Sequence, residues 1–240
     1  MIICHRKKFV ILAPWKTASS TIHARLRAYS ESPYSRFYDF NPNLNRVVHQ
    51  HLVYADFAAL PESKHGYFSA SFIRNPYDRV YSGFRQLQKD INQQPFSPYS
   101  QPWIKALVMK QLSENFDTLC RAGFEFNTWL SLVDDHQFLD VGRNSSFPLH
   151  PAHYWTHLDG KQGVDFVGRV ENFEQDFQEL CVRISVEPLE KINDNVDVEP
   201  IRLGPGSDNY KSAKLMNSAS ISRINDLFRA DFDLFGYERI

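Results

Sequence analysis

Hydrophobic runs separated by polar turns divide the chain into an alternation of expected strands and helices. Residues 9–13, 67–73 and 164–169 are short apolar or alternating runs bounded by turn residues, and they predict three buried strands. Because strands that alternate with helices form βαβ crossovers, the pattern predicts an α/β fold with a central, mostly parallel sheet flanked by helices. No internal repeat or linker interrupts the pattern, so we expect a single domain over residues 1–240.

Five segments carry apolar residues at the spacing of a helix packed by one face: 21–30, 103–120, 124–134, 171–184 and 218–232. In the first, the apolar face contains Ile22, so His23 and Arg25 are expected to face solvent. The second is expected to bury Leu107, Leu112, Phe116 and Leu119. The third is expected to bury Phe126, Trp129, Leu130 and Val133.

The turn after the first expected strand gathers hydroxyl groups around one lysine. Pro14 ends the strand, and Lys16 is followed by Thr17, Ser19, Ser20 and Thr21. An ammonium, four hydroxyls and the N–H groups of a helix start supply the donors that a phosphate or sulfate needs. The Walker pattern GxxxxGK[ST] is absent, because no glycine occurs before Gly66. Taken alone, the turn fits an anion site and a strand–helix corner with hydroxyl caps equally well.

A second polar turn, RNPYDR at residues 74–79, begins a helix that carries Ser82. By itself it indicates a proline-initiated helix with surface arginines. The segments PWKTASSTI, FIRNPYDRVYSGF, DFVGRVENFEQDF and DFDLFGY, in this order, resemble the sulfotransferases that use 3′-phosphoadenosine 5′-phosphosulfate (PAPS). The resemblance spans most of the chain. It is to the branch of carbohydrate 2-O- and 4-O-sulfotransferases and their short bacterial relatives.

The resemblance implies the P-loop kinase-like sulfotransferase fold and transfer of a sulfuryl group from PAPS to a hydroxyl of a carbohydrate or similar acceptor. The residues implied to hold the 5′-phosphosulfate are Trp15, Lys16, Thr17, Ala18, Ser19, Ser20 and Thr21. Lys16 would also neutralise the bridging oxygen as the S–O bond breaks. Arg74 and Ser82 would bind the 3′-phosphate, which separates PAPS from ATP. A loop closing over the nucleotide would add Ser207, Tyr210 and Lys211.

Two histidines precede the segment LVYAD. An H-x-H pair alone more often marks a polar edge, but the family places a histidine here, and His51 is the better match. Imidazole has an ordinary pKa suited to taking a hydroxyl proton near neutral pH, so His51 is the expected general base. His49 matches the companion histidine of the 2-O-sulfotransferase branch and is expected to contact the acceptor.

Three further histidines have spacings that a zinc site on a helix could use. His150, His153 and His157 would share one helical face, but Pro151 interrupts the run and no cysteine or carboxylate completes a ligand set. No metal is therefore expected, and the family requires none. By resemblance this segment borders the acceptor. His153 stands where relatives have a glutamine, so it is an expected acceptor contact whose role is open.

Two departures from the resemblance concern the first turn. Most short relatives read Pro-Lys-Thr-Ala-Gly where this chain has Trp15-Lys16-Thr17-Ala18-Ser19. A tryptophan before the lysine also occurs in the 4-O-sulfotransferase branch. Serine in place of glycine could narrow the loop at the phosphosulfate.

Composition limits the possible partners. With 240 residues, 42% of them hydrophobic, the chain can bury one sizeable core. A net charge of -1 gives no global field that favours nucleic acid, a membrane surface or a long polyanionic glycan. The expected partner is a hydroxyl-bearing glycan or glycoconjugate. Three scattered cysteines form no disulfide framework, and MIICHRKK is too short for a signal peptide or transmembrane anchor, so we expect a cytoplasmic, bacterial protein.

Two other functions compete with sulfuryl transfer. A small-molecule kinase would use the same turn with ATP, but the Walker glycines are missing and the pair of Arg74 and Ser82 suits a 3′-phosphate. The other alternative is a catalytically inactive nucleotide-binding module. The retained Lys16 and His51 argue against it.

Overall fold

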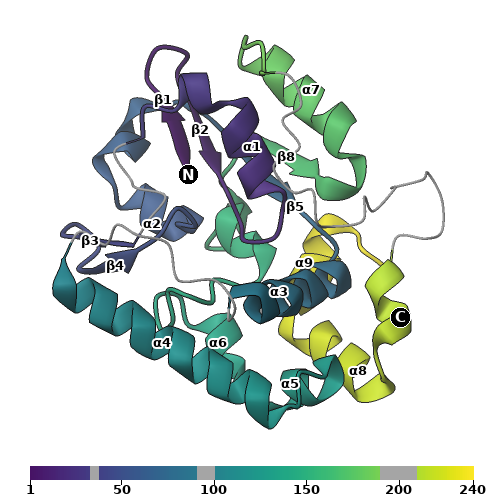
Figure 1. Ribbon diagram of the computed structural model, residues 1–240. Coiled ribbons are helices and arrows are strands. Elements are labelled where there is room, and N and C mark those ends of the chain that lie inside the picture. Colours follow the sequence, from purple (N-terminus) through teal and green to yellow (C-terminus); the bar gives the residue numbers. More distant parts are fainter. Residues whose placement is uncertain (33–37, 91–100, 190–209) are drawn as a thin grey trace. The chain divides into compact units, whose positions relative to one another are not determined.

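The structure is a computed structural model that describes residues 1–32, 38–90, 101–189 and 210–240 (Figure 1). Its chain forms two compact units. The first consists of Met1–Tyr34, His51–Arg74 and Tyr154–Asn209, and the second of Ser35–Gln50, Asn75–His153 and Tyr210–Ile240. Because three separate segments build each unit, neither unit corresponds to one half of the sequence. Each is therefore described by itself.

The first unit is built on a four-stranded sheet in the order β1-β2-β5-β8. The strands are β1 (Ile2–Cys4), β2 (Phe9–Leu12), β5 (Phe68–Ile73) and β8 (Phe166–Arg169). β2, β5 and β8 run parallel, and β1 pairs with β2 in the antiparallel direction. The predicted α/β class and mostly parallel sheet are confirmed. Each predicted strand is one or two residues longer than the observed one.

β1 is a strand that the hydrophobic pattern does not predict. Its residues Ile2, Ile3 and Cys4 are at most 1% exposed. Three apolar residues are too short a run to indicate a strand by themselves. Their strand conformation depends on pairing with β2, which follows after the polar turn at residues 5–8.

Aromatic side chains form the core on one face of this sheet. The Phe72 ring lies 6.2 Å from that of Phe166 and 5.5 Å from that of Phe173, and Phe173 stacks on Phe177 at 5.4 Å. Gly168 is the register partner of Phe72 in the parallel pair of β5 and β8. A Cβ atom at Gly168 would stand 2.5 Å from the Phe72 ring, so the glycine leaves room for that ring.

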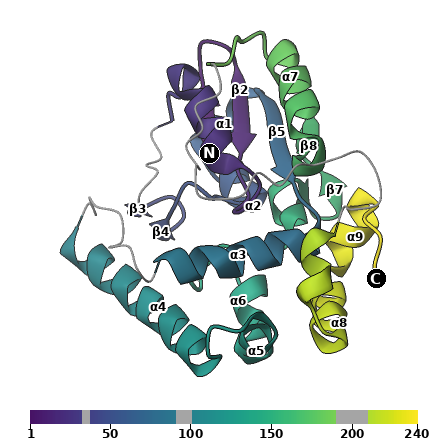
Figure 2. The same ribbon diagram turned by 45° about the vertical axis from the view of Figure 1, so that its right-hand side comes forward.

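Two helices cover this face (Figure 2), α1 (Ser19–Arg25) and α7 (Phe173–Arg183). Ile22 of α1 is buried in the core, as predicted. The prediction for His23 and Arg25 is wrong. His23 is 6% exposed, and the Arg25 guanidinium lies 4.2 Å from the ring centre of Phe177 and 3.1 Å from the Glu174 carboxylate. Arg25 thus covers an aromatic face while its charge meets a carboxylate near the surface.

The remaining elements of the first unit are short. They are η1 (Arg27–Tyr29), α2 (Tyr54–Ala58), η2 (Pro61–His65), β6 (His157–Leu158), β7 (Lys161–Gln162) and η4 (Val170–Asn172), where η marks a 3₁₀ helix. The predicted helices at 21–30 and 171–184 are each an α-helix joined to a 3₁₀ turn. Periodicity therefore locates these helices, but not where their hydrogen-bonding pattern changes.

The second unit is mainly helical. Its elements are β3 (Asp39–Asn41), β4 (Arg46–Val48), α3 (Pro76–Asp90), α4 (Pro102–Arg121), α5 (Phe126–Leu132), α6 (Asp135–Leu139), η5 (Lys211–Leu215), α8 (Ser218–Leu227) and α9 (Arg229–Phe235). The 3₁₀ turn η3 (Ala152–Trp155) spans the point in the chain where the second unit gives way to the first. The single helix predicted at 218–232 is two helices. They are separated at the buried Phe228, which has φ −110° and ψ 21°.

The buried face of α4 differs from the predicted one. Leu119 is buried, but Phe116 is 38% exposed, and Leu107 and Leu112 are only partly buried. The buried residues are Ile104, Val108, Gln111, Asn115 and Leu119. Hydrophobic periodicity misses this face because Asn115 is a polar residue that is buried with a hydrogen bond, to the Ser146 hydroxyl at 2.8 Å. In the described ranges, neither α4 nor any other helix has the length and apolar character to cross a membrane.

The buried face predicted for residues 124–134 is confirmed. Its four predicted residues are at most 8% exposed. The Trp129 ring lies 5.2 Å from that of Phe84 in α3 and 6.1 Å from that of Phe147. These aromatic side chains therefore belong to the core of the second unit.

Candidate active site

The turn that follows β2 has two residues in left-handed backbone conformations. Lys16 and Ala18 have φ angles of 66° and 59°, whereas Thr17 between them does not have a positive φ. Thr17 is fully buried, and its hydroxyl donates a hydrogen bond to the carbonyl of Pro14 at 2.8 Å. Left-handed residues that alternate with right-handed ones form the backbone nests that bind anions, and Lys16 and Ala18 supply the left-handed positions of such a pattern.

The predicted donor side chains are arranged around this turn. Lys16 is partly exposed, and its Nζ lies 5.8 Å from the ring centre of Trp15. Ser19, the first residue of α1, is buried, Ser20 is exposed and Thr21 is partly buried. Ser19 does not have a positive φ. A serine in place of glycine therefore causes no backbone strain at this position.

His51 is buried beside the start of the turn. Its Nδ1 lies 2.6 Å from the carbonyl oxygen of Ala13, the residue that follows β2, and the residue is 8% exposed. Because a carbonyl oxygen can only accept, Nδ1 carries a proton, and the lone pair of the neutral ring lies on Nε2. The first unit therefore brings His51 together with the turn that contains Lys16. The hydrogen bond fixes the tautomer that a general base requires.

Arg74 leaves the sheet at the same edge as the turn. Leu12, the last residue of β2, is the register partner of Ser71 in the parallel strand β5. Beyond this pair β2 continues into the turn, and β5 continues through Ile73 to the partly exposed Arg74. Ligands of α/β proteins bind at the carboxyl ends of parallel strands, so Arg74 is on the edge where an anion would be bound.

The residues after Arg74 cap α3 in the second unit. The Asn75 side chain accepts a hydrogen bond from the N–H of Asp78 and donates one to the Asp78 carboxylate, both at 2.8 Å. Pro76 occupies the first helical position, where its missing N–H is harmless. Arg79, predicted to be a surface arginine, is fully buried and donates to the carbonyl of His150 at 2.6 Å. These residues therefore hold the start of α3 in place.

Asp78 also holds the segment that carries Tyr210 and Lys211. Its Oδ1 accepts a hydrogen bond from the N–H of Ser212 at 2.9 Å. The second unit therefore joins the start of α3, the helix that carries the partly buried Ser82, to η5, where Lys211 is exposed.

Tyr210 is tied to the last residues of the described chain. Its hydroxyl accepts a hydrogen bond from the N–H of Glu238 at 2.8 Å, and its ring meets that of Tyr77 edge-on at 5.5 Å. The Tyr77 hydroxyl donates to Asn225 at 2.5 Å and accepts from the N–H of Ile240 at 3.0 Å. Burial raises the pKa of Tyr77, so the phenol stays a neutral donor.

The three histidines considered for zinc do not share a helix. His150 Nδ1 lies 2.8 Å from the carbonyl of Phe138, and His153 Nδ1 lies 2.8 Å from the Asp231 carboxylate, both in the second unit. His157 belongs to β6 of the first unit. In the part of the chain that the structure describes, no three His, Cys, Asp or Glu residues are grouped as metal ligands would be.

Two further predicted residues are not placed with the turn. His49 belongs to the second unit, and its ring lies 4.8 Å from that of Tyr38. Ser207 lies outside the described residues.

A comparison with families of known proteins decides the class of this protein. The sequence model of the Sulfotransferase family matches residues 1–238, which include segments of both units. The chain belongs to the sulfotransferase family. No curated protein and no solved structure matches it. The protein is therefore a transferase of sulfuryl groups, and the family implies an acceptor that bears a hydroxyl.

In this sulfotransferase, two carboxylates that sequence reasoning did not single out contact the segments of predicted site residues. Asp78 follows Asn75 by three residues, and this capping-box spacing is a signal that the sequence does contain. Asp231 has no such signal, because its partner His153 lies 78 positions away along the chain. Only the folded second unit reveals that pair.

The left-handed conformation of Ala18 predicts an ordered effect of substitutions. Ala18→Gly should raise the free energy of unfolding by up to about 1.5 kcal/mol, because it removes a penalty of about 1–2 kcal/mol while adding about 0.5–1 kcal/mol of backbone entropy cost. Ala18→Val should lower it, since a branched Cβ is poorly tolerated at positive φ. Urea unfolding measures both. Ala24→Gly, inside α1, is the control and should cost about 1 kcal/mol. Equal stability of the three Ala18 proteins would contradict this conformation.

Proposed function

We propose that this sulfotransferase moves the sulfuryl group of PAPS to a hydroxyl of a carbohydrate or glycoconjugate, without a metal. The observation that carries the proposal is the hydrogen bond from His51 Nδ1 to the Ala13 carbonyl. It holds the imidazole of His51, the proposed general base, beside the turn in which Lys16 lies, within one unit of the fold. The succession of β2, this turn and α1 also supports assignment to the P-loop kinase-like sulfotransferase fold.

The turn supplies the features needed to hold a phosphosulfate. The backbone at Lys16 and Ala18 favours N–H groups directed to one side, and the Lys16 ammonium adds a full positive charge. The remaining proposed contacts to the 5′-phosphosulfate are Trp15, Thr17, Ser19, Ser20 and Thr21. Thr17 contributes its backbone, because its hydroxyl already donates to Pro14.

In the proposed reaction the acceptor oxygen forms a bond to sulfur while the bond from sulfur to the bridging oxygen breaks. His51 Nε2 takes the proton of the acceptor hydroxyl, and the leaving oxygen stays on adenosine 3′,5′-bisphosphate. Lys16 offsets the negative charge that develops on that oxygen. His51 thus acts on the acceptor, and Lys16 acts on the leaving oxygen of the nucleotide. Loss of His51 should therefore affect chemistry more than nucleotide binding.

Recognition of the 3′-phosphate is assigned first to Arg74. Its position after β5, at the edge where β2 enters the turn, supports this role. A guanidinium binds phosphate through two parallel hydrogen bonds, which suits a terminal phosphate. The same role for Ser82, and contacts from Ser207, Tyr210 and Lys211, rest on the sequence resemblance. His49 and His153 are proposed on the acceptor side on the same basis.

The nucleotide preference tests the donor. Adenosine 3′,5′-bisphosphate should raise the melting temperature of the protein strongly, AMP should raise it little, and Mg-ATP should not exceed AMP. A ligand that binds only the folded state stabilises it by about 2.7 kcal/mol at a hundredfold excess over Kd. Arg74→Ala should remove the difference between the bisphosphate and AMP, whereas Arg27→Ala, an exposed arginine in η1, should not. Preference for Mg-ATP would indicate a kinase, and no response of a folded protein would indicate an inactive module.

Lys16→Met tests the charge in the turn. The variant keeps a long apolar side chain beside Trp15 but loses the ammonium, so the rate of sulfuryl transfer should fall by about two to three decades. Single-turnover transfer from PAPS is the measurement, with Lys214→Met on η5 as the control. Transfer at a near-normal rate by Lys16→Met would remove this residue from the mechanism.

His51→Asn separates the two ring nitrogens of the proposed base. The Asn amide can still donate to the Ala13 carbonyl as Nδ1 does, but it has no atom at Nε2. We expect kcat to fall by about 10²–10⁴-fold while the affinity for adenosine 3′,5′-bisphosphate changes little. His49→Asn is the comparison. If that variant loses more activity than His51→Asn, the assignment of the base to His51 is wrong.

A further inference from the structure

One side of α4 bears a stripe of exposed apolar and small residues. In steps of three and four residues along the helix, the stripe consists of Ala106, Met109, Ser113, Phe116 and Cys120, all of which are exposed. Met109 is 41% exposed and Phe116 is 38% exposed. Two large apolar side chains, two turns apart, are therefore in contact with water on this side of the helix.

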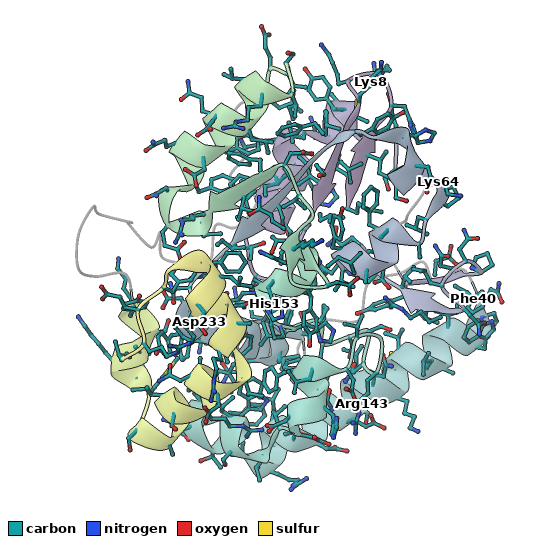
Figure 3. The ribbon with its side chains drawn as sticks, turned by 180° about the vertical axis from the view of Figure 1, so that it is seen from behind. Lys8, Phe40, Lys64, Arg143, His153 and Asp233 are labelled. Atoms are coloured by element: carbon teal, nitrogen blue, oxygen red, sulfur yellow. The ribbon has the colours of Figure 1, made fainter. Side chains whose placement is uncertain are left out.

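Another side of α4 is covered by the second unit itself. Val47 of β4 packs against Ile104 in the core, and the Gln111 amide donates to the carbonyl of Arg143 at 3.3 Å. Figure 3 shows Phe40 and Arg143 beside this helix. Because an α-helix has 3.6 residues per turn, these buried residues and the exposed stripe lie on different sides of α4.

Small and large side chains alternate along the stripe, and this pattern is complementary to a second copy of itself. Steps of three and four residues are the seam spacing of paired helices. If two copies of α4 run antiparallel about a twofold axis, Met109 of each copy can face Cys120 of the other. Ser113 then faces Phe116 of the other copy. Each of these layers pairs a large side chain with a small one, so the two stripes fit together without a clash.

The charges beside the stripe select the antiparallel direction. Lys110 and Asp117 each follow a large stripe residue, so they lie on the same flank. In the antiparallel register, Lys110 of each copy lies opposite Asp117 of the other, and the symmetry repeats this contact. A parallel pair would instead bring Lys110 to Lys105 of the other copy. The Lys110 side chain is 75% exposed, although its ammonium lies 3.8 Å from the Glu114 carboxylate of the same helix.

We propose that a second copy of this chain docks on the stripe, and that the two α4 helices form an antiparallel pair in a twofold symmetric dimer. Burial of Met109 and Phe116 of both copies supplies the attraction. Lys110 and Asp117 fix the register. The seam extends only from Met109 to Cys120, so the dimer should dissociate on dilution. This inference is independent of the proposed function.

Sedimentation equilibrium over a wide range of protein concentration tests the dimer. The unmodified protein should pass from monomer to dimer as its concentration rises. Phe116→Glu should remain monomeric, because it places a carboxylate between the helices. The control is Leu132→Glu, at a residue of α5 that is 37% exposed, and it should dimerise as the unmodified protein does. A monomer at every concentration, or a dimer that Phe116→Glu leaves unchanged, would overturn the proposal.

An exchange of charges tests the register. Lys110→Asp and Asp117→Lys should each raise the Kd of the dimer by about tenfold, because each replaces two attractive contacts with repulsive ones. The double variant restores opposite charges and should bring the Kd back. Circular dichroism checks that each variant keeps its helices. If the double variant dimerises no better than the single ones, the antiparallel register is wrong.

A disulfide tests which residues face each other. With diamide as oxidant, Met109→Cys should become linked to Cys120 of the second copy, and the further change Cys120→Ser should prevent this. The unmodified protein should not become linked through Cys120, because the two Cys120 residues would be about 16 Å apart along the helix axis. Cys4 and Cys181 are buried. Linkage of the unmodified protein through Cys120, or no linkage of dimeric Met109→Cys, would overturn the arrangement.

Discussion

The hydrogen bond between His51 and the Ala13 carbonyl is the contact on which the candidate site depends. It joins residues 38 positions apart and sets the orientation of an imidazole against the end of β2. Both partners are buried. Breaking the bond would leave the buried Ala13 carbonyl without a hydrogen-bond donor, which costs about 1–3 kcal/mol. The same carbonyl belongs to the residue before Pro14. The start of the turn and the position of the His51 imidazole are therefore fixed together.

The hydrophobic pattern predicts the parallel strands but not the antiparallel strand β1. β2 is buried along its whole length, β5 is buried except at its first residue, and β8 alternates buried and partly buried residues, so the three strands appear as apolar or alternating runs in the sequence. β1 has only three residues, too few to indicate a strand by themselves, and it is recognised as a strand only by its pairing with β2. The predictions of which helix residues are buried are incomplete for a related reason. Arg25 and Asn115 are polar, yet each is covered by a specific partner, and such partners are invisible to periodicity.

Sequence motifs locate residues of the candidate site, but they do not show which contacts hold those residues in place. The motif RNPYDR is continuous in the sequence, but the structure gives its parts different positions. Arg74 follows β5, Asn75 and Asp78 cap α3, and Arg79 is buried. The capping part follows from local spacing. The contact of Asp78 with Ser212 does not, because 134 positions separate the two residues. Long-range contacts of this kind require the fold.

Two histidines of this sulfotransferase are held through Nδ1, one by a backbone carbonyl and the other by a carboxylate. The Ala13 carbonyl fixes the tautomer of His51 without placing a negative charge beside it. The counter-charge for an imidazolium formed during the reaction would then come from the anionic donor in the adjacent turn, so proton acceptance would be favoured when that donor is bound. His153 instead meets the carboxylate of Asp231, which two backbone N–H groups hold in place. Both contacts fix the orientation of a ring, so the choice of His51 as the proposed proton acceptor rests on its position beside the turn that contains Lys16, within the same unit of the fold.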